Sequence, residues 1–212
     1  MSGSYDFEEQ ERIAELRAWW EDNRWYVIAA VTAGVIAFIG YRGYAWWQQK
    51  AQADAAAAYS PVAEAVTAGD KKKADDAAKV LIDKYPRSFY ASEAALMLAR
   101  DAFEAGNLDE AAKQLRWVID HGAEVHRGLA RTRLASVLLD QKKYDEALKT
   151  LDGNTDEAYA PMVADVRGDI MFAQNRMDEA RAAYKAAVDK ADTHNPVKQI
   201  AQTKLAALGG AQ

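Results

Sequence analysis

The side chains that most often carry chemistry in proteins are sparse in this chain. It has no cysteine and only three histidines, His121, His126 and His194. Histidines that bind metal or activate a nucleophile have a partner residue at a defined spacing, and none of these three has one in the sequence. Phosphate-binding and dinucleotide-binding glycine motifs are also absent from the sequence. We therefore expect no catalytic residue, no metal and no cofactor, and we predict that the protein is not an enzyme.

A run of three lysines, residues 71–73, could indicate a nucleic-acid or anionic-lipid site. Asp70, Asp75 and Asp76 surround it, and the formal net charge of the chain is −5 at pH 7. Acidic neighbours and an acidic chain oppose binding to a polyanion. We interpret the run as a solvated loop between helices and expect no nucleic-acid partner.

The elements that would position any binding residues are helices. Residues 48–212 are rich in alanine, which has the highest helix propensity, and the whole chain has four prolines. No run of alternating polar and β-branched residues indicates a strand. The predicted fold class is all-α.

These helices form repeats. A turn, a hydrophobic residue and then Asp-Glu-Ala recur, with the alanines at Ala111, Ala147 and Ala180, separated by 36 and then 33 residues. A degenerate copy ends at Ala77. A period near 34 residues is typical of tetratricopeptide repeats, in which each unit is a helical hairpin. We predict a solenoid of three to four hairpins, capped by a helix that begins at Asn195-Pro196.

Each repeat also has the large and small side chains that a close helix pair needs. Thirteen residues before the motif alanine stand Leu98-Ala99 and Leu134-Ala135, whereas the third copy has Arg167-Gly168. Four residues after each alanine, counting Ala77 of the degenerate copy, come Leu81, Leu115, Leu151 and Tyr184. These positions predict the packed face of each hairpin, with a departure from the pattern at Arg167.

A membrane anchor precedes the repeats. Residues 25–41 contain no charge, and aromatic side chains flank this run at both ends. With Arg42 at its end, the segment reaches the roughly 20 residues that a membrane-spanning helix requires. We predict an acidic tail at 1–24, a transmembrane helix at 25–47 and the repeat domain at 48–212. A cleaved signal peptide, with a processing site at Ala51-Gln52-Ala53, is the main alternative.

Charge alone leaves the orientation of the anchor open. Three arginines precede the anchor, and Arg42 and Lys50 follow its uncharged run. This small excess favours the short tail in the cytoplasm and the repeat domain outside. The alternative is the opposite topology, in which the repeats face the cytoplasm and recruit soluble partners to the membrane.

Two surfaces are candidates for recognition. Small residues at helical spacing in the anchor could let another membrane helix approach closely. The first helix of each repeat hairpin lines the concave groove of such an array, which commonly binds peptides or partner helices. The anchor stripe consists of Ala29, Ala33, Ala37 and Gly40, and the predicted groove residues are Arg100, Phe103, Ser136, Leu139, Asp169 and Phe172.

Along nearly its whole length the chain resembles a known family, the YfgM-like ancillary subunits of the bacterial Sec translocon. The resemblance rests on the aromatic pair Trp19-Trp20, the anchor end Tyr41-Arg42, and the repeat sequences LKTLD at 148–152 and VADVRGD at 163–169. The last of these is the most specific, and it contains the departure at Arg167.

The resemblance implies an inner-membrane protein with a cytoplasmic amino terminus and a periplasmic repeat domain. It also implies partners: the SecYEG channel, a membrane-anchored periplasmic chaperone of the prolyl-isomerase type, non-native secreted proteins and the lipid bilayer. Its implied function is a non-enzymatic scaffold that helps to hand over secreted proteins. No catalytic residue carries over, and a membrane-anchored enzyme is the third and weakest alternative.

Overall fold

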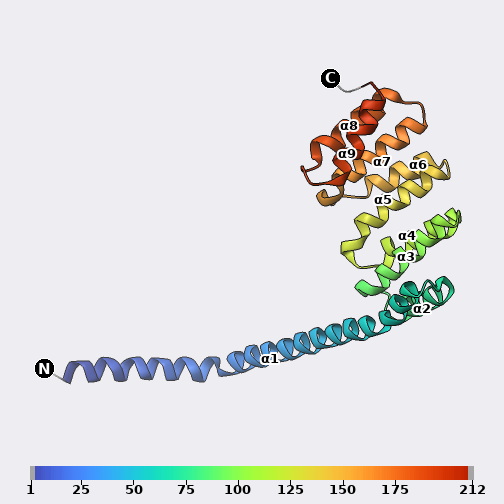
Figure 1. Ribbon diagram of the computed structural model, residues 1–212. Coiled ribbons are helices and arrows are strands. Elements are labelled where there is room, and N and C mark those ends of the chain that lie inside the picture. Colours follow the sequence, from blue (N-terminus) through green and yellow to red (C-terminus); the bar gives the residue numbers. More distant parts are fainter. Residues whose placement is uncertain (1–2, 210–212) are drawn as a thin grey trace. The chain divides into compact units, whose positions relative to one another are not determined.

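The computed structural model describes residues 3–209, with side chains described from residue 12 onward, and all secondary structure in this part of the chain is helical. The prediction of an all-α fold is therefore confirmed. The helices are α1 (Gly3–Thr67), α2 (Lys71–Lys84), α3 (Phe89–Glu104), α4 (Leu108–His121), α5 (Glu124–Asp140), α6 (Tyr144–Asp152), α7 (Ala160–Ala173), α8 (Met177–Lys190) and α9 (Pro196–Ala207), with a 3₁₀ turn at Glu157–Tyr159 (Figure 1).

The chain divides into two compact units, residues 1–50 and residues 51–212. The described part of the first unit is a single stretch of α1, and its apolar side chains are exposed, including Val31, Phe38 and Ile39. Length and composition make α1 a candidate membrane-spanning helix. An apolar helix that buries none of its side chains against protein needs another apolar environment, which a bilayer supplies.

The second unit is a series of helical hairpins that follow one another in chain order (Figure 1). The last turns of α1 share a buried core with α2, and α3/α4, α5/α6 and α7/α8 form the next three hairpins. Ala55 and Val62 of α1 are fully buried in this core, and the rings of Tyr59 and Tyr90 lie 5.5 Å apart. The first repeat therefore begins within α1.

All four hairpins turn in the same way. The second residue after the first helix has a positive φ, and the backbone N–H of the residue that follows it donates to the carbonyl five residues earlier, which is the Schellman geometry. Glycine adopts this conformation without strain, whereas Lys142 and Asn175 adopt it with φ of 60° and 62°. The turn positions are Gly69, Gly106, Lys142 and Asn175, and their closing bonds measure 2.8–3.0 Å.

The repeat register predicted from the Asp-Glu-Ala motif is confirmed for the last three hairpins. Ala111, Ala147 and Ala180 are completely buried, as the close approach of two helices requires. Leu115, Leu151 and Tyr184 are also buried. The motif aspartates lie in the first turn of each second helix, where a negative charge interacts favourably with the helix dipole.

The register predicted for the first hairpin is wrong by three residues. Asp70 caps α2 through its side chain as Asn107 caps α4, so the counterpart of Ala111 is Ala74 rather than Ala77. Ala74 is buried, whereas Ala77 is partly exposed. The three lysines expected in a loop instead form the first turn of α2. The acidic pair Asp75-Asp76 resembles the Asp-Glu of the motif but lies about one helical turn further along α2.

The last hairpin replaces the usual alanine and leucine pair by Gly168 and Tyr184. A Cβ added at Gly168 would lie 2.4 Å from Cε1 of Tyr184, so only glycine leaves space for the ring. Arg167, where the repeat pattern fails, pairs with Asp152 of α6 at 2.6 Å. The capping helix α9 begins as predicted, because Asn195 accepts a hydrogen bond from the N–H of Val197 and Pro196 occupies the first turn.

Candidate protein-binding groove

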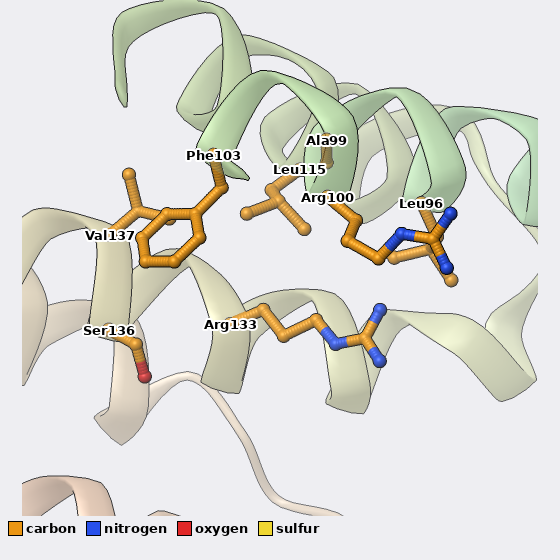
Figure 2. Close-up of a pocket in the computed structure, with 8 residues that line it drawn as sticks. All are labelled: Leu96, Ala99, Arg100, Phe103, Leu115, Arg133, Ser136 and Val137. Atoms are coloured by element: carbon orange, nitrogen blue, oxygen red, sulfur yellow. The ribbon is translucent and has the colours of Figure 1, made fainter. Parts of the chain in front are cut away.

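A pocket of about 250 Å³ lies between α3 and α5, the first helices of two successive hairpins (Figure 2). This is smaller than the roughly 300 to 1,000 Å³ typical of pockets for drug-sized ligands. Its size suits one side chain of a partner better than a cofactor. The lining residues are Leu96, Ala99, Arg100 and Phe103 of α3, Leu115 of α4, and Arg133, Ser136 and Val137 of α5.

Helical spacing places these residues together. Leu96, Arg100 and Phe103 lie one turn apart on the same face of α3, and Arg133 and Val137 do so on α5. The small Ala99 and Ser136 leave space between the two faces. Most lining atoms are apolar, and the Phe103 side chain remains partly open to solvent, with 43% of its surface exposed.

Two arginines give this apolar pocket a positive rim. Figure 2 shows the guanidinium groups of Arg100 and Arg133 extending toward the end of the pocket that Leu96 occupies. Arg100 pairs with carboxylates of its own helix, at 3.1 Å from Asp101 and 3.8 Å from Glu104. Within residues 12–209, the guanidinium of Arg133 has no ion-pair partner.

The structure brings together three of the six residues predicted for the groove. Arg100, Phe103 and Ser136 line the pocket, whereas Leu139 is half-buried against the core of the domain. Phe172 of α7 has 49% of its surface exposed but lies outside this pocket. Sequence reasoning missed Arg133, whose position immediately before the packed Leu134 could have revealed it.

The sixth predicted residue, Asp169, takes part in a polar network within the domain. Its carboxylate accepts hydrogen bonds from the hydroxyl of Tyr184 at 2.8 Å and from Nζ of Lys204 at 2.8 Å. Lys204, on α9, also donates to Asp165 at 2.9 Å. Asp165 and Asp169 hold the same positions relative to Gly168 as Leu96 and Arg100 hold relative to Ala99. The network in the last hairpin therefore takes the place of the Leu96 and Arg100 side chains of α3.

Burial and hydrogen bonding together shift the pKa values of this network. Burial raises the pKa of Asp165 and of Tyr184, and the hydrogen bond to Asp169 raises the pKa of Tyr184 further. For Lys204, burial opposes the charged form, but the hydrogen bonds to Asp169 and Asp165 and the negative charges of these two residues together outweigh it and raise the pKa overall. Near neutral pH the phenol and the ammonium group therefore both act as donors.

The three histidines occupy separate places in the fold. His126 is buried in α5, with its Nε2 2.6 Å from Glu93 of α3 and its ring 4.6 Å from that of Phe89. His121 is the last residue of α4, and His194 precedes α9. Among the side chains that the structure describes, no three histidine or acidic residues gather in a way that could hold a metal ion.

The predicted anchor stripe lies on α1 in the first unit. Ala29, Ala33, Ala37 and Gly40 are all exposed, and a Cβ built on Gly40 meets no atom within 4 Å. Small residues at this spacing leave a shallow face along the helix. Its role in helix association remains a prediction.

Comparison with known proteins gives a consistent result over nearly the whole chain. Residues 17–210 match a family model described as a tetratricopeptide repeat-like domain. Proteins named ancillary SecYEG translocon subunit are similar along their length: one from Neisseria gonorrhoeae is 31% identical, with 95% of this chain and 97% of that protein covered. The Escherichia coli protein is 29% identical, with 93% and 95% covered, and the Haemophilus influenzae protein 26%, with 95% and 98% covered. The chain belongs to the ancillary SecYEG translocon subunit family.

Proposed function

We propose that this protein is a non-enzymatic scaffold in the bacterial inner membrane that associates with the SecYEG channel. The observation that carries the proposal is the similarity to ancillary SecYEG translocon subunits over 95% of the chain. That similarity includes the predicted anchor as well as the hairpins. Helical hairpins with an open pocket suit a protein that binds other proteins.

In the proposed arrangement, residues 1–24 lie in the cytoplasm, residues 25–47 cross the membrane, and the repeat domain from residue 48 lies in the periplasm. The repeat groove would hold a membrane-anchored chaperone of the prolyl-isomerase type or a non-native secreted protein. The protein would thereby help to transfer emerging secreted proteins from the channel to periplasmic chaperones. The alternative function is recruitment of cytoplasmic partners by repeats that face inward.

The anchor contact can be tested with the double variant Ala33→Leu/Ala37→Leu. Larger side chains block close approach of a second membrane helix, so we expect less SecYEG to co-purify with the full-length variant from detergent. The matched control is Val31→Leu/Val35→Leu, which changes side chains on the opposite face of α1. Equal recovery of SecYEG with both double variants and the parent would remove the stripe from the proposal.

The groove contact requires a separate experiment. Phe103→Ser and Phe172→Ser each remove an exposed aromatic side chain from the first helix of a hairpin. We expect the double variant to retain SecYEG through the anchor but to recover less periplasmic chaperone. Its melting temperature must match that of the parent for the comparison to count. Recovery of every partner by the anchor segment alone would show that the repeats have another purpose.

A further inference from the structure

The α3–α5 pocket combines an apolar floor with a cationic rim, and this combination restricts what can bind there. Leu96, Leu115 and Val137 form much of the floor, while Arg100 and Arg133 stand at the rim. The positive rim contrasts with the net charge of −5 of the chain as a whole. A purely apolar ligand group would pack against the floor but would make no interaction with the two guanidinium groups, which would remain hydrated.

The two arginines are available to a ligand. Arg133 is exposed and has no ion pair in the described part of the chain. Arg100 pairs with Asp101 and Glu104, but 59% of its side chain is exposed and such surface pairs contribute little to stability. A guanidinium group can bind a carboxylate through two parallel hydrogen bonds, so both side chains favour a ligand with carboxylates.

We propose that this pocket binds an internal segment of a partner protein in which a large apolar side chain has acidic residues beside it. The apolar side chain fills the space over Leu96, Leu115 and Phe103, and its acidic neighbours pair with Arg100 and Arg133. The inference rests on the proposed function to the extent that the groove is taken as the site for a protein partner. It adds the chemistry by which that partner is recognised.

The last repeat explains why such a segment would bind at α3–α5 and not farther along. There the positions of Leu96 and Arg100 are taken by Asp165 and Asp169, and Lys204 of α9 binds both carboxylates. An acidic ligand would meet two acidic side chains whose cation is already engaged. The last hairpin therefore does not offer the apolar and cationic surface that an acidic segment finds at α3–α5.

A set of blocked peptides tests the proposal on the full-length protein in detergent micelles. Each peptide has one phenylalanine between two pairs of aspartates, two pairs of asparagines or two pairs of lysines, with both ends blocked. Fluorescence anisotropy should give at least about fivefold tighter binding for the aspartate peptide than for the asparagine peptide, equivalent to about 1 kcal/mol. Raising the salt concentration should reduce this difference.

Two arginine variants locate the effect. Arg133→Gln should weaken binding of the aspartate peptide about fivefold and leave the asparagine peptide unchanged. Arg87→Gln removes the charge of an exposed arginine that does not line the pocket, and it should change neither affinity. Melting temperatures equal to that of the parent establish that both variants are folded.

Several results would overturn the proposal. Equal affinity for all three peptides, tighter binding of the lysine peptide or absence of binding would exclude recognition of an acidic segment. Binding only after the carboxyl terminus of the peptide is left free would assign the pocket to chain ends instead. Each of these outcomes leaves the proposed function intact if SecYEG and the chaperone still co-purify with the protein, because that test does not depend on the charge of the peptide.

Discussion

Small side chains determine how closely the two helices of each hairpin approach. Ala147 of α6 is completely buried, and so are its counterparts in α4 and α8. Replacing Ala147 by leucine inserts three extra carbon atoms where no space exists. We expect Ala147→Leu to destabilise the protein by about 1 to 3 kcal/mol. Chemical denaturation measures this, with Ala182→Leu at an exposed position of α8 as the matched control. Equal stability of the Ala147→Leu variant and the parent would contradict the repeat register.

The pair Gly168–Tyr184 also combines a small residue on one helix with a large side chain on the other, but with different residue types. In the second and third hairpins the equivalent positions hold alanine and leucine, at Ala99 and Leu115 in the second hairpin. Glycine normally lowers helix stability by about 1 kcal/mol relative to alanine. Its presence in the middle of α7 is explained by the Tyr184 ring, which occupies the space of a Cβ.

A double-mutant cycle tests this steric exchange. Gly168→Ala should destabilise the protein by about 1 to 3 kcal/mol, despite the better helix propensity of alanine, because the new methyl group overlaps the Tyr184 ring. Tyr184→Leu should also destabilise it, since the hydrogen bond to Asp169 is lost. The double variant recreates the alanine–leucine pair of the earlier hairpins, so it should be more stable than the sum of the two losses predicts. Simple additivity in unfolding free energies would mean that the ring and the methyl group do not compete.

The capping helix α9 is held to the array by a cation on its inner face. Lys204 reaches the carboxylates of Asp165 and Asp169 on α7, and Arg181 of α8 donates to the carbonyl of Leu208 at 2.9 Å. A capping helix that is only 12 residues long gains little stability by itself. Its position depends on these contacts and on the burial of Ala201.

The ion pairs of Lys204 make the capping helix sensitive to alkaline pH. The hydrogen bonds to Asp169 and Asp165 raise the pKa of Lys204 in the folded state above its ordinary value of 10.5. Their stabilising contribution is therefore complete below pH 10.5 and is lost as pH rises through the raised pKa. Lys204→Met should lower the free energy of unfolding by about 2 kcal/mol at pH 7. This is less than the loss for a fully buried ion pair, because the side chains of Lys204 and Asp169 are each 30% exposed.

Unfolding free energies of the parent and Lys204→Met, measured from pH 7 to pH 12, check this prediction. The difference between the two proteins should shrink above pH 10.5, and hydrogen exchange should be faster in α9 of the variant at pH 7. Lys185→Met, at an exposed position of α8, controls for the loss of a lysine. A difference that stays constant across the pH range would show that Lys204 acts through packing alone.

The helices can be predicted from the sequence because their signals are local. The alanine period, the Asn195-Pro196 start signal and the uncharged run each lie within a few residues of the feature they predict. The predicted register of the first repeat is wrong because Asp75-Asp76 imitates the motif while Asp70 provides the cap. The role of Asp169 depends on Lys204, which lies 35 residues later in the chain, and sequence spacing within one repeat does not reveal that contact.

Pocket residues can be predicted only where the repeat pattern identifies the exposed face of a first helix. That pattern predicts Arg100, Phe103 and Ser136, whose positions follow from counting back from the motif alanines. Arg133 and Val137 of α5 also line the pocket, but the two positions counted back in each first helix include Ser136 and not these two residues. Leu139 occupies the equivalent of Phe103 but is half-buried.

The long helix α1 has two roles at different points along its length. Its apolar stretch is exposed, whereas Ala55, Val62 and Ala65 near its end are buried in the first hairpin. Cleavage after Ala53 would remove the predicted anchor, whereas the part of α1 that packs in the first hairpin would remain in the protein. We expect the anchor to be kept, since the 24 residues before it carry three arginines and seven acidic residues, unlike the basic start of a signal peptide.

The orientation of this anchored molecule decides between the two proposed functions. A reporter enzyme that is active only outside the cytoplasm, fused after Gln212, should be active if the repeat domain lies in the periplasm. The matched fusion replaces the amino-terminal tail before Trp25 by the same reporter, and it should be inactive. Carbonate extraction should leave the intact fusion in the membrane, and the amino terminus of the mature protein should lie near Met1 rather than at Asp54. If the carboxyl-terminal fusion is inactive and the amino-terminal fusion is active, the topology is the reverse of the proposed one, which supports recruitment of cytoplasmic partners. If carbonate releases the repeat domain and its amino terminus is Asp54, the segment before it is a cleaved signal peptide.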